Sequence, residues 1–169
     1  MAQVGGIKTM RRLFIIRKDL HLSAGKLAAM VAHCAEGYWT HKILDSIDGV
    51  SNRDINTDEP TEYHFSLYLP ADELENYLRG SFTKTICEAR NLDHLLKAGN
   101  MANELGLVLG EDYGYIDDNC LTELKPEFIG DDDKPHCRVG IWFKPLEDDV
   151  AHSISKKFKL YRDDVLKGA

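Results

Sequence analysis

The sequence predicts an α/β protein in which helices cover both faces of a central sheet. Stretches with strand character alternate along the chain with segments whose apolar residues recur every three or four positions, a pattern typical of layered α/β folds. The chain has 169 residues, the usual size of one domain, and its 43% hydrophobic and 29% charged residues are typical of a globular protein. We therefore expect a single domain that spans residues 1–169.

The first unit is a strand, a short loop and a helix. Residues 10–18 are predicted to form a central strand, because residues 13–16 make a continuous apolar run. Ser23 stands at the N-cap position, and from Ala24 onward apolar residues recur at helical spacing. The helix is therefore expected to bury one face, made by Leu27, Met30, Val31, Cys34 and Tyr38.

The middle of the chain contains two further pairs of strand and helix. Residues 45–60 are acidic and rich in turn formers, which predicts a solvated loop. After this loop the pattern predicts a strand at 62–69, a short helix at 71–79, a strand at 82–89 and a helix at 92–106 that Asn91 caps.

The last third of the chain begins with a short strand-like run at residues 113–118. A charged loop with two prolines follows at 123–136. A strand at 138–144 and a final helix at 146–161 complete the alternating pattern.

Charge is distributed unevenly along the chain. The formal net charge of −7 argues against a nucleic-acid partner, because lysine and arginine bind phosphates. Residues 1–44 nevertheless hold seven basic and two acidic residues, a net charge of +5, whereas residues 45–75 hold nine acidic residues against one arginine, a net charge of −8. The basic segment supplies candidates for a phosphate-positioning surface, with Arg17 and Lys26 foremost among Arg11, Arg12, Arg17, Lys18 and Lys26.

The sequence lacks the signals of membrane and secreted proteins. No window approaches the eighteen or so apolar residues of a membrane span, and the apolar run near the N-terminus is too short for a signal peptide. We therefore expect a cytoplasmic protein. The cysteines form no Cys-x-x-Cys pair, which predicts buried free thiols at Cys34, Cys87, Cys120 and Cys137. We expect no metal and no other cofactor.

The start of the first helix places charge in an unusual position. Lys26 lies in the first turn, where the helix macrodipole favours an anion over a cation, so helix stability does not explain the lysine. A lysine beside free helical N–H groups makes an anion site, and Gly25 leaves room for a ligand. His33 follows two turns later on the same face. From spacing alone, a solvated lysine and a half-buried histidine remain the commoner interpretation.

The residues around this helix start form a recognisable motif. Residues 15–35 read IIRKDLHLSAGKLAAMVAHCA. This stretch resembles the start of the peptidyl-tRNA hydrolase 2 family, in which a strand ends in an Arg-x-Asp-Leu loop and leads into a Ser-x-Gly-Lys helix. The matching residues are Arg17, Asp19, Leu20, Ser23, Gly25, Lys26, Ala28 and His33. One position departs from the pattern, because Met30 stands where the family has a glutamine.

A second family motif, of the type Ile-Arg-Asp-Ala-Gly-x-Thr, resembles IDDNCLTELKP at residues 116–126. In this alignment Asp118 takes the place of the catalytic aspartate and Thr122 that of the threonine. The remaining positions depart, since Asp117 replaces the arginine and Asn119 and Cys120 replace Ala-Gly. A threonine that family members often carry in the last strand is replaced by Val139.

A competing alignment of the second motif uses residues 111–114. It places Asp112 in the aspartate position and matches the glycine with Gly114. We favour Asp118, because only that alignment also supplies the threonine and the following proline, Pro126.

The resemblance implies hydrolysis of the ester that joins a peptidyl or N-blocked aminoacyl group to tRNA, which releases free tRNA. Asp118 is then expected to orient or deprotonate a water, Lys26 to stabilise the oxyanion or hold the terminal phosphates, and Thr122 to fix the carboxylate or the substrate. His33 is expected to hold the helix in place by packing and hydrogen bonding. The full set expected to bind substrate is Arg17, Asp19, Ser23, Gly25, Met30 and His33.

The resemblance also implies a three-layer α/β/α sandwich around a mixed, mainly four-stranded sheet. It implies a homodimer that acts on peptidyl-tRNA or tRNA, with no membrane partner. The acidic segment at about residues 45–62 is interpreted as an insertion in this fold.

The departures from the motifs leave an alternative function open. With Met30, Cys120 and Val139 at motif positions, the chain is also consistent with a catalytically silent module that binds tRNA or another nucleotide ligand. A third interpretation, a regulatory partner whose acidic segment imitates nucleic acid, depends on the segment of net charge −8 alone.

Overall fold

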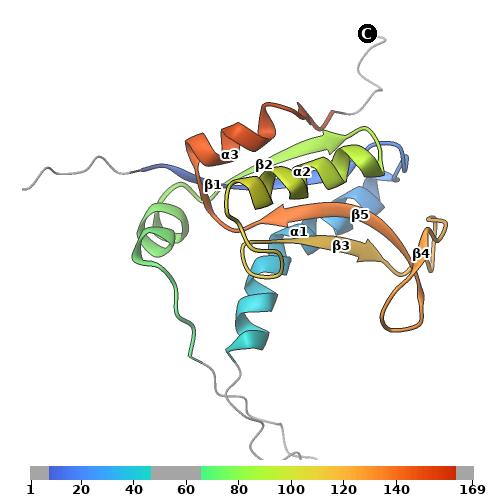
Figure 1. The fold of residues 1–169 in the computed structure, drawn as a ribbon, viewed down its shortest axis with the longest axis horizontal. Coiled ribbons are helices and arrows are strands. Elements are labelled where there is room, and N and C mark those ends of the chain that lie inside the picture. Colours follow the sequence, from blue (N-terminus) through green and yellow to red (C-terminus); the bar gives the residue numbers. More distant parts are fainter. Residues whose placement is uncertain (1–7, 47–65, 163–169) are drawn as a thin grey trace, which may run out of the picture.

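The structure is a computed structural model that describes residues 8–46 and 66–162. The described chain forms seven strands and four helical segments (Figure 1). In chain order these are β1 (Met10–Arg17), α1 (Ala24–Asp45), the π-helical η1 (Glu73–Ser81), β2 (Thr83–Ala89), α2 (Leu92–Glu104), β3 (Tyr113–Asp118), β4 (Phe128–Ile129), β5 (Pro135–Phe143), β6 (Leu146–Glu147), α3 (Asp148–Ser155) and β7 (Lys159–Leu160).

The sheet is mixed, with the strand order β3-β5-β1-β2-β7. β1 and β2 run parallel, whereas β5 runs antiparallel to both of its neighbours, β1 and β3. The short strands β4 and β6 pair with β5 and β1 respectively. The four longer strands correspond to the strands predicted at residues 10–18, 82–89, 113–118 and 138–144, but β5 begins at Pro135, inside the loop predicted at 123–136. The prediction of four strands was therefore incomplete, because β4, β6 and β7 have two residues each, too few to show periodicity.

Helices cover both faces of the sheet, which confirms the expected α/β fold with a mixed sheet. The alternating side chains of β1 show the layers: Leu13 and Ile15 pack with α2 and α3, whereas Phe14 and Ile16 pack with α1. All four side chains are fully buried, so β1 is the central strand that the apolar run predicted. The predicted buried face of α1 is narrower than expected, since its buried residues are Met30, Cys34 and Tyr38.

Two predicted elements differ from the structure. The strand expected at residues 62–69 is wrong for the described residues 66–69, which form no regular secondary structure, and residues 62–65 lie outside the described chain. The final helix is shorter than expected, because α3 ends at Ser155. Phe158 then packs into the core, and Leu160 pairs with Cys87 of β2, so the chain after α3 extends the sheet. This pairing depends on tertiary contacts that a local pattern does not contain.

Three of the four cysteines, Cys34, Cys87 and Cys137, are buried free thiols as predicted, and Cys120 is half-buried. Burial raises the pKa of the Cys34 thiol to about 12. None of the helices in the described ranges combines the length and the apolar character that a membrane span requires. Most of the acidic segment at residues 45–62 lies outside the described residues.

Candidate active site

An open groove of about 1180 Å³ runs between α1 and β3, the last strand on one side of the sheet. Helix α1 contributes Lys26, Met30 and His33 to one wall, at the spacing of successive helical turns. The opposite wall comes from β3 and the turn that follows it, and it ends with Thr122. The groove thus brings residues of the two motifs, almost a hundred positions apart in the chain, to one place.

Lys26, Asp118 and Thr122 meet at one end of the groove. The ammonium nitrogen of Lys26 lies 2.5 Å from Oδ2 of Asp118 and donates a hydrogen bond to Oγ1 of Thr122 at 3.2 Å. The side chains of Lys26 and Asp118 are only 15% and 9% exposed, so water screens this ion pair less than a surface pair. The structure therefore brings together the three residues predicted to be catalytic.

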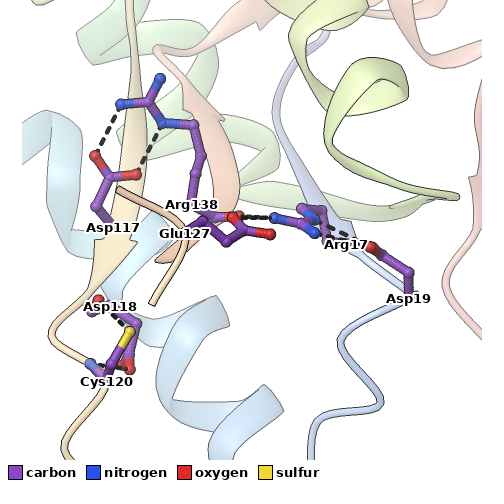
Figure 2. A network of polar contacts seen from close by, with 7 residues as sticks. All are labelled: Arg17, Asp19, Asp117, Asp118, Cys120, Glu127 and Arg138. Atoms are coloured by element: carbon purple, nitrogen blue, oxygen red, sulfur yellow. Dashed lines mark hydrogen bonds and ion pairs between the residues drawn. The ribbon is translucent and has the colours of Figure 1, made fainter. Parts of the chain in front are cut away.

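The turn after β3 holds the Asp118 carboxylate in place. The backbone N–H of Cys120 donates a hydrogen bond to Oδ1 of Asp118 at 2.9 Å, and the Cys120 thiol lies 3.4 Å from the carbonyl oxygen of Asp118 (Figure 2). Among the described residues, each of the two carboxylate oxygens thus has one donor. Because a carboxylate offers about four acceptor positions, lone pairs remain for a water or a substrate group.

The N-terminus of α1 is built as predicted from Ser23 and Gly25, but it already has an anionic partner. The Ser23 hydroxyl caps the helix by accepting the backbone N–H of Lys26. The carboxylate of Glu123 accepts hydrogen bonds from the Ser23 hydroxyl at 2.7 Å and from its backbone N–H at 3.1 Å. Open space surrounds the position where a Cβ of Gly25 would lie. Glu123 was not predicted, and its place after Thr122 is the only local signal.

Arg17 and Asp19 form an ion pair that braces the structure, and this corrects the expectation that Arg17 meets a substrate phosphate. The Arg17 side chain is 4% exposed, and its guanidinium contacts both carboxylate oxygens of Asp19, the carboxylate of Glu127 at 2.6 Å and the carbonyl oxygen of Arg138 (Figure 2). Burial disfavours its charged form, but the two carboxylates outweigh burial and raise the pKa of Arg17. Asp19, about one third exposed, is the partner of Arg17.

The basic segment at residues 1–44 does not form the free cationic surface that its sequence predicts. Arg11 pairs with Asp148, and Lys18 lies 4.0 Å from Glu88. Arg12 is fully buried and donates to three backbone carbonyl oxygens, those of Cys34, Ala35 and Phe143. Most cations of this segment are thus paired with groups of the protein itself.

Two other residues of the predicted set line the groove in different ways. Met30 is 3% exposed and belongs to the core beneath the groove, so it forms part of the floor. His33 is exposed on the wall, which corrects the expectation that it is packed and hydrogen bonded. Within the described residues its imidazole is a surface group that faces the groove.

The geometry distinguishes the two alignments of the second motif. Asp112 lies 2.9 Å from the Lys144 ammonium and accepts a hydrogen bond from the backbone N–H of Val108, and it is not part of the groove wall. Burial alone would raise the pKa of Asp112, but these two partners lower it below the usual range. Asp118, not Asp112, contacts Lys26.

Sequence reasoning missed the ion pair beside the site. Asp117, which stands at the arginine position of the motif, bonds through both oxygens to the guanidinium of Arg138, directly across from it on β5 (Figure 2). Arg138 in turn lies over the rings of Tyr115 and Phe128. Compared with the family motif, which has its arginine at the position of Asp117, the cation here is Arg138 on the neighbouring strand. A pattern read along one strand does not reveal this. Within the described ranges, no group of three or more metal-ligating side chains occurs.

Comparison with known proteins agrees with this geometry. The family model described as Peptidyl-tRNA hydrolase PTH2 matches residues 10–161, nearly the whole chain. A search among curated proteins finds no match. Because the family match includes both groove walls and the three residues that meet at its end, the chain belongs to the PTH2 family of peptidyl-tRNA hydrolases.

Proposed function

We propose that this protein hydrolyses the ester between a peptidyl or N-blocked aminoacyl group and tRNA, with Lys26, Asp118 and Thr122 as its catalytic residues. The observation that carries the proposal is the convergence of these three side chains at one end of a large open groove. Ester hydrolysis needs a positioned water, a group that takes its proton and positive charge at the oxyanion. The three side chains supply these functions without a metal.

Each residue has a role that follows from its contacts. Asp118 has free lone pairs beside those used by Cys120 and Lys26, so it orients the attacking water and accepts its proton. Lys26 stabilises the negative charge that develops on the carbonyl oxygen of the ester as water adds, and the proton taken by Asp118 passes to the departing 3′ oxygen of the ribose. Thr122 accepts from the Lys26 ammonium and sets its direction. Gly25, directly before Lys26, leaves space for a substrate group at the helix start.

A catalytically silent module that binds tRNA is the second candidate. The observation that favours it is Met30, whose thioether lines the groove where the family motif has a glutamine. A thioether does not donate hydrogen bonds and accepts them only weakly, so it does not replace an amide beside Lys26. The homodimer and the cytoplasmic location remain predictions.

The first test is hydrolysis of N-acetyl-aminoacyl-tRNA by the wild type and four variants. We expect Lys26→Ala to lower kcat/KM by about 10²–10³-fold, as for the loss of an oxyanion donor. We expect Asp118→Asn to lower it by about 10²–10⁴-fold, because the amide does not accept the proton. Thr122→Val should cost about tenfold and Thr122→Ser much less, because serine keeps the hydroxyl.

Asp112→Asn is the matched control, because it changes a carboxylate of the same region that lies outside the groove. It should keep wild-type turnover, and circular dichroism should show that all variants are folded. Absence of turnover by the folded wild type, with tRNA binding intact, would sink the hydrolase proposal and leave the silent module. Loss of activity in Asp112→Asn alone would instead support the competing alignment.

A further inference from the structure

The groove follows an edge of the sheet. Six consecutive residues, 114–119, line it. Successive side chains of a strand point to opposite faces, so an unbroken series of lining residues means that the strand's backbone borders the groove. β3 is the terminal strand of the sheet, with β5 on one side only (Figure 1).

The backbone of β3 alternates between β5 and the outer edge. The Asp112 carbonyl oxygen accepts the backbone N–H of Lys144, which follows β5, so Asp112 faces inward. Tyr113 faces outward, because its N–H donates to the carbonyl oxygen of Val108 at 3.4 Å and its own carbonyl accepts from Gly110 at 2.8 Å. Two residues later, Tyr115 must face outward as well, since the register is regular as far as Ile116.

The outward groups of Tyr115 are available to a ligand. Within the described residues, no hydrogen bond outside the β3–β5 ladder involves the N–H or the carbonyl oxygen of Tyr115, and these two groups point away from β5. An unpaired strand edge of this kind accepts an extended peptide, with main-chain hydrogen bonds as the source of affinity.

The position of the groove indicates which peptide binds at this strand edge. Asp118 ends β3 and contacts Lys26, so a substrate ester bound there places its peptidyl group along the edge. From Asp118 back to Gly114 the strand spans roughly 13 Å, room for about four extended residues. The remaining volume continues to His41 and Gly110.

We infer that the peptidyl part of the substrate binds as an added strand beside β3, hydrogen bonded to the backbone of Tyr115. The inference depends on the proposed function for the position of the ester. Because the esterified C-terminus lies at Asp118, the peptide runs parallel to β3. Recognition through the backbone makes binding depend on peptide length rather than on peptide sequence.

The test measures binding and does not require turnover. The probes are peptides of one, two or three residues joined by an amide to 3′-amino-3′-deoxyadenosine, which the enzyme does not cleave as an ester. We expect the three-residue probe to bind about tenfold more tightly than the one-residue probe. The Tyr115 amide should become protected from hydrogen exchange, and N-methylation of the peptide amide that donates to the Tyr115 carbonyl oxygen should remove the gain.

A matched pair of α1 variants locates the peptide. Thr40 is exposed in the far part of the groove wall, so Thr40→Trp should remove the advantage of the longer probe. Leu44 lies on the same helix, 61% exposed and outside the groove wall, so Leu44→Trp should keep the advantage. Equal affinity of the three probes, or no protection of Tyr115, overturns the inference.

Turnover separates failure of this inference from failure of the proposed function. Hydrolysis of N-acetyl-aminoacyl-tRNA with equal kcat/KM for longer peptidyl-tRNAs would keep the hydrolase and reject the added strand. Length-dependent binding of the probes without any turnover would keep the added strand and reject the hydrolase.

Discussion

Cys120 holds the turn after β3 in a left-handed backbone conformation, with φ of 55°. Its N–H reaches the Asp118 carboxylate from this conformation. The matching family position is the glycine of the second motif, which has no Cβ to oppose positive φ. Cys120 thus adopts the same left-handed turn as the glycine, but its Cβ makes this conformation unfavourable in free energy.

Cys120→Gly is expected to stabilise the protein. Relief of the left-handed conformation contributes about 1–2 kcal/mol, and the greater freedom of glycine in the unfolded chain costs about 0.5–1 kcal/mol. The free energy of unfolding in urea should therefore rise by about 0.5–1 kcal/mol. Cys120→Ala removes the thiol but keeps the Cβ, so it should show no such gain. Destabilisation by the glycine variant and not by alanine would contradict this account.

At the scale of elements, α1 packs on the sheet through the Trp142 indole. A Cβ at Gly37 of α1 would lie 2.7 Å from the indole, and one at Gly114 of β3 would lie 2.5 Å from it. The two glycines therefore form a slot for the ring, and the ring forms part of the groove floor. The distance between the two groove walls depends on this contact.

Gly37→Ala tests the slot. Alanine improves helix propensity by about 1 kcal/mol, but overpacking costs about 1–3 kcal/mol. We expect net destabilisation of about 1 kcal/mol in urea denaturation, with reduced turnover because the groove walls move apart. Gly25→Ala is the control for stability on the same helix, because its Cβ would meet open space. Equal stability of the two variants would show that the indole has room.

A second contact joins α1 to η1. Oε2 of Glu73 accepts a hydrogen bond from the Tyr38 hydroxyl at 2.5 Å, and both side chains are buried. Burial raises the pKa of Glu73, although Tyr38 and two nearby lysines, Lys144 and Lys42, lower it in part.

This shift makes stability depend on pH. The folded protein holds the Glu73 proton more tightly than the unfolded chain does, so Glu73 opposes folding as pH rises from the unfolded pKa near 4.5 through the folded pKa. The difference in unfolding free energy between Glu73→Gln and wild type should therefore increase across this range and then level off. Urea denaturation between pH 4 and 8 measures it. A flat difference would contradict the shift.

At the scale of the whole molecule, the net charge is −7, and ion pairs within the protein leave few cations of the basic segment at residues 1–44 for tRNA. Phosphate contacts release counterions, and each adds close to one unit to the slope of log affinity against log salt. A tRNA surface built on this segment therefore predicts a shallow dependence on salt.

We expect tRNA affinity to fall only about tenfold between 50 and 200 mM salt, as for about two phosphate contacts. Filter binding with deacylated tRNA measures the slope. A Lys26→Ala variant should reduce the slope by up to one unit if the lysine holds a phosphate, and by nothing if it acts only at the ester. A slope typical of six or more contacts would contradict the view that ion pairs within the protein neutralise the basic segment.

The sequence by itself determined the α/β class, the four longer strands and the helix start at Ser23. These features depend on periodicity and capping, which are local properties of the chain. The choice of Lys26, Asp118 and Thr122 came instead from the resemblance to the peptidyl-tRNA hydrolase 2 family, and their catalytic roles stay predictions. The expectation that Arg17 meets a substrate phosphate did not foresee its two carboxylate partners: Asp19 is only two residues away, but Glu127 lies 110 positions away and no local pattern brings it close.

Only the tertiary structure decided which charges remain free, where the strand edge opens and how the groove is shaped. The Arg138–Asp117 pair, the Glu123 contact with Ser23 and the Trp142 slot each join segments distant in sequence. The partner of a side chain depends on which segments the folded chain brings within a few ångströms of it. A local sequence pattern carries no information about the distance between such segments.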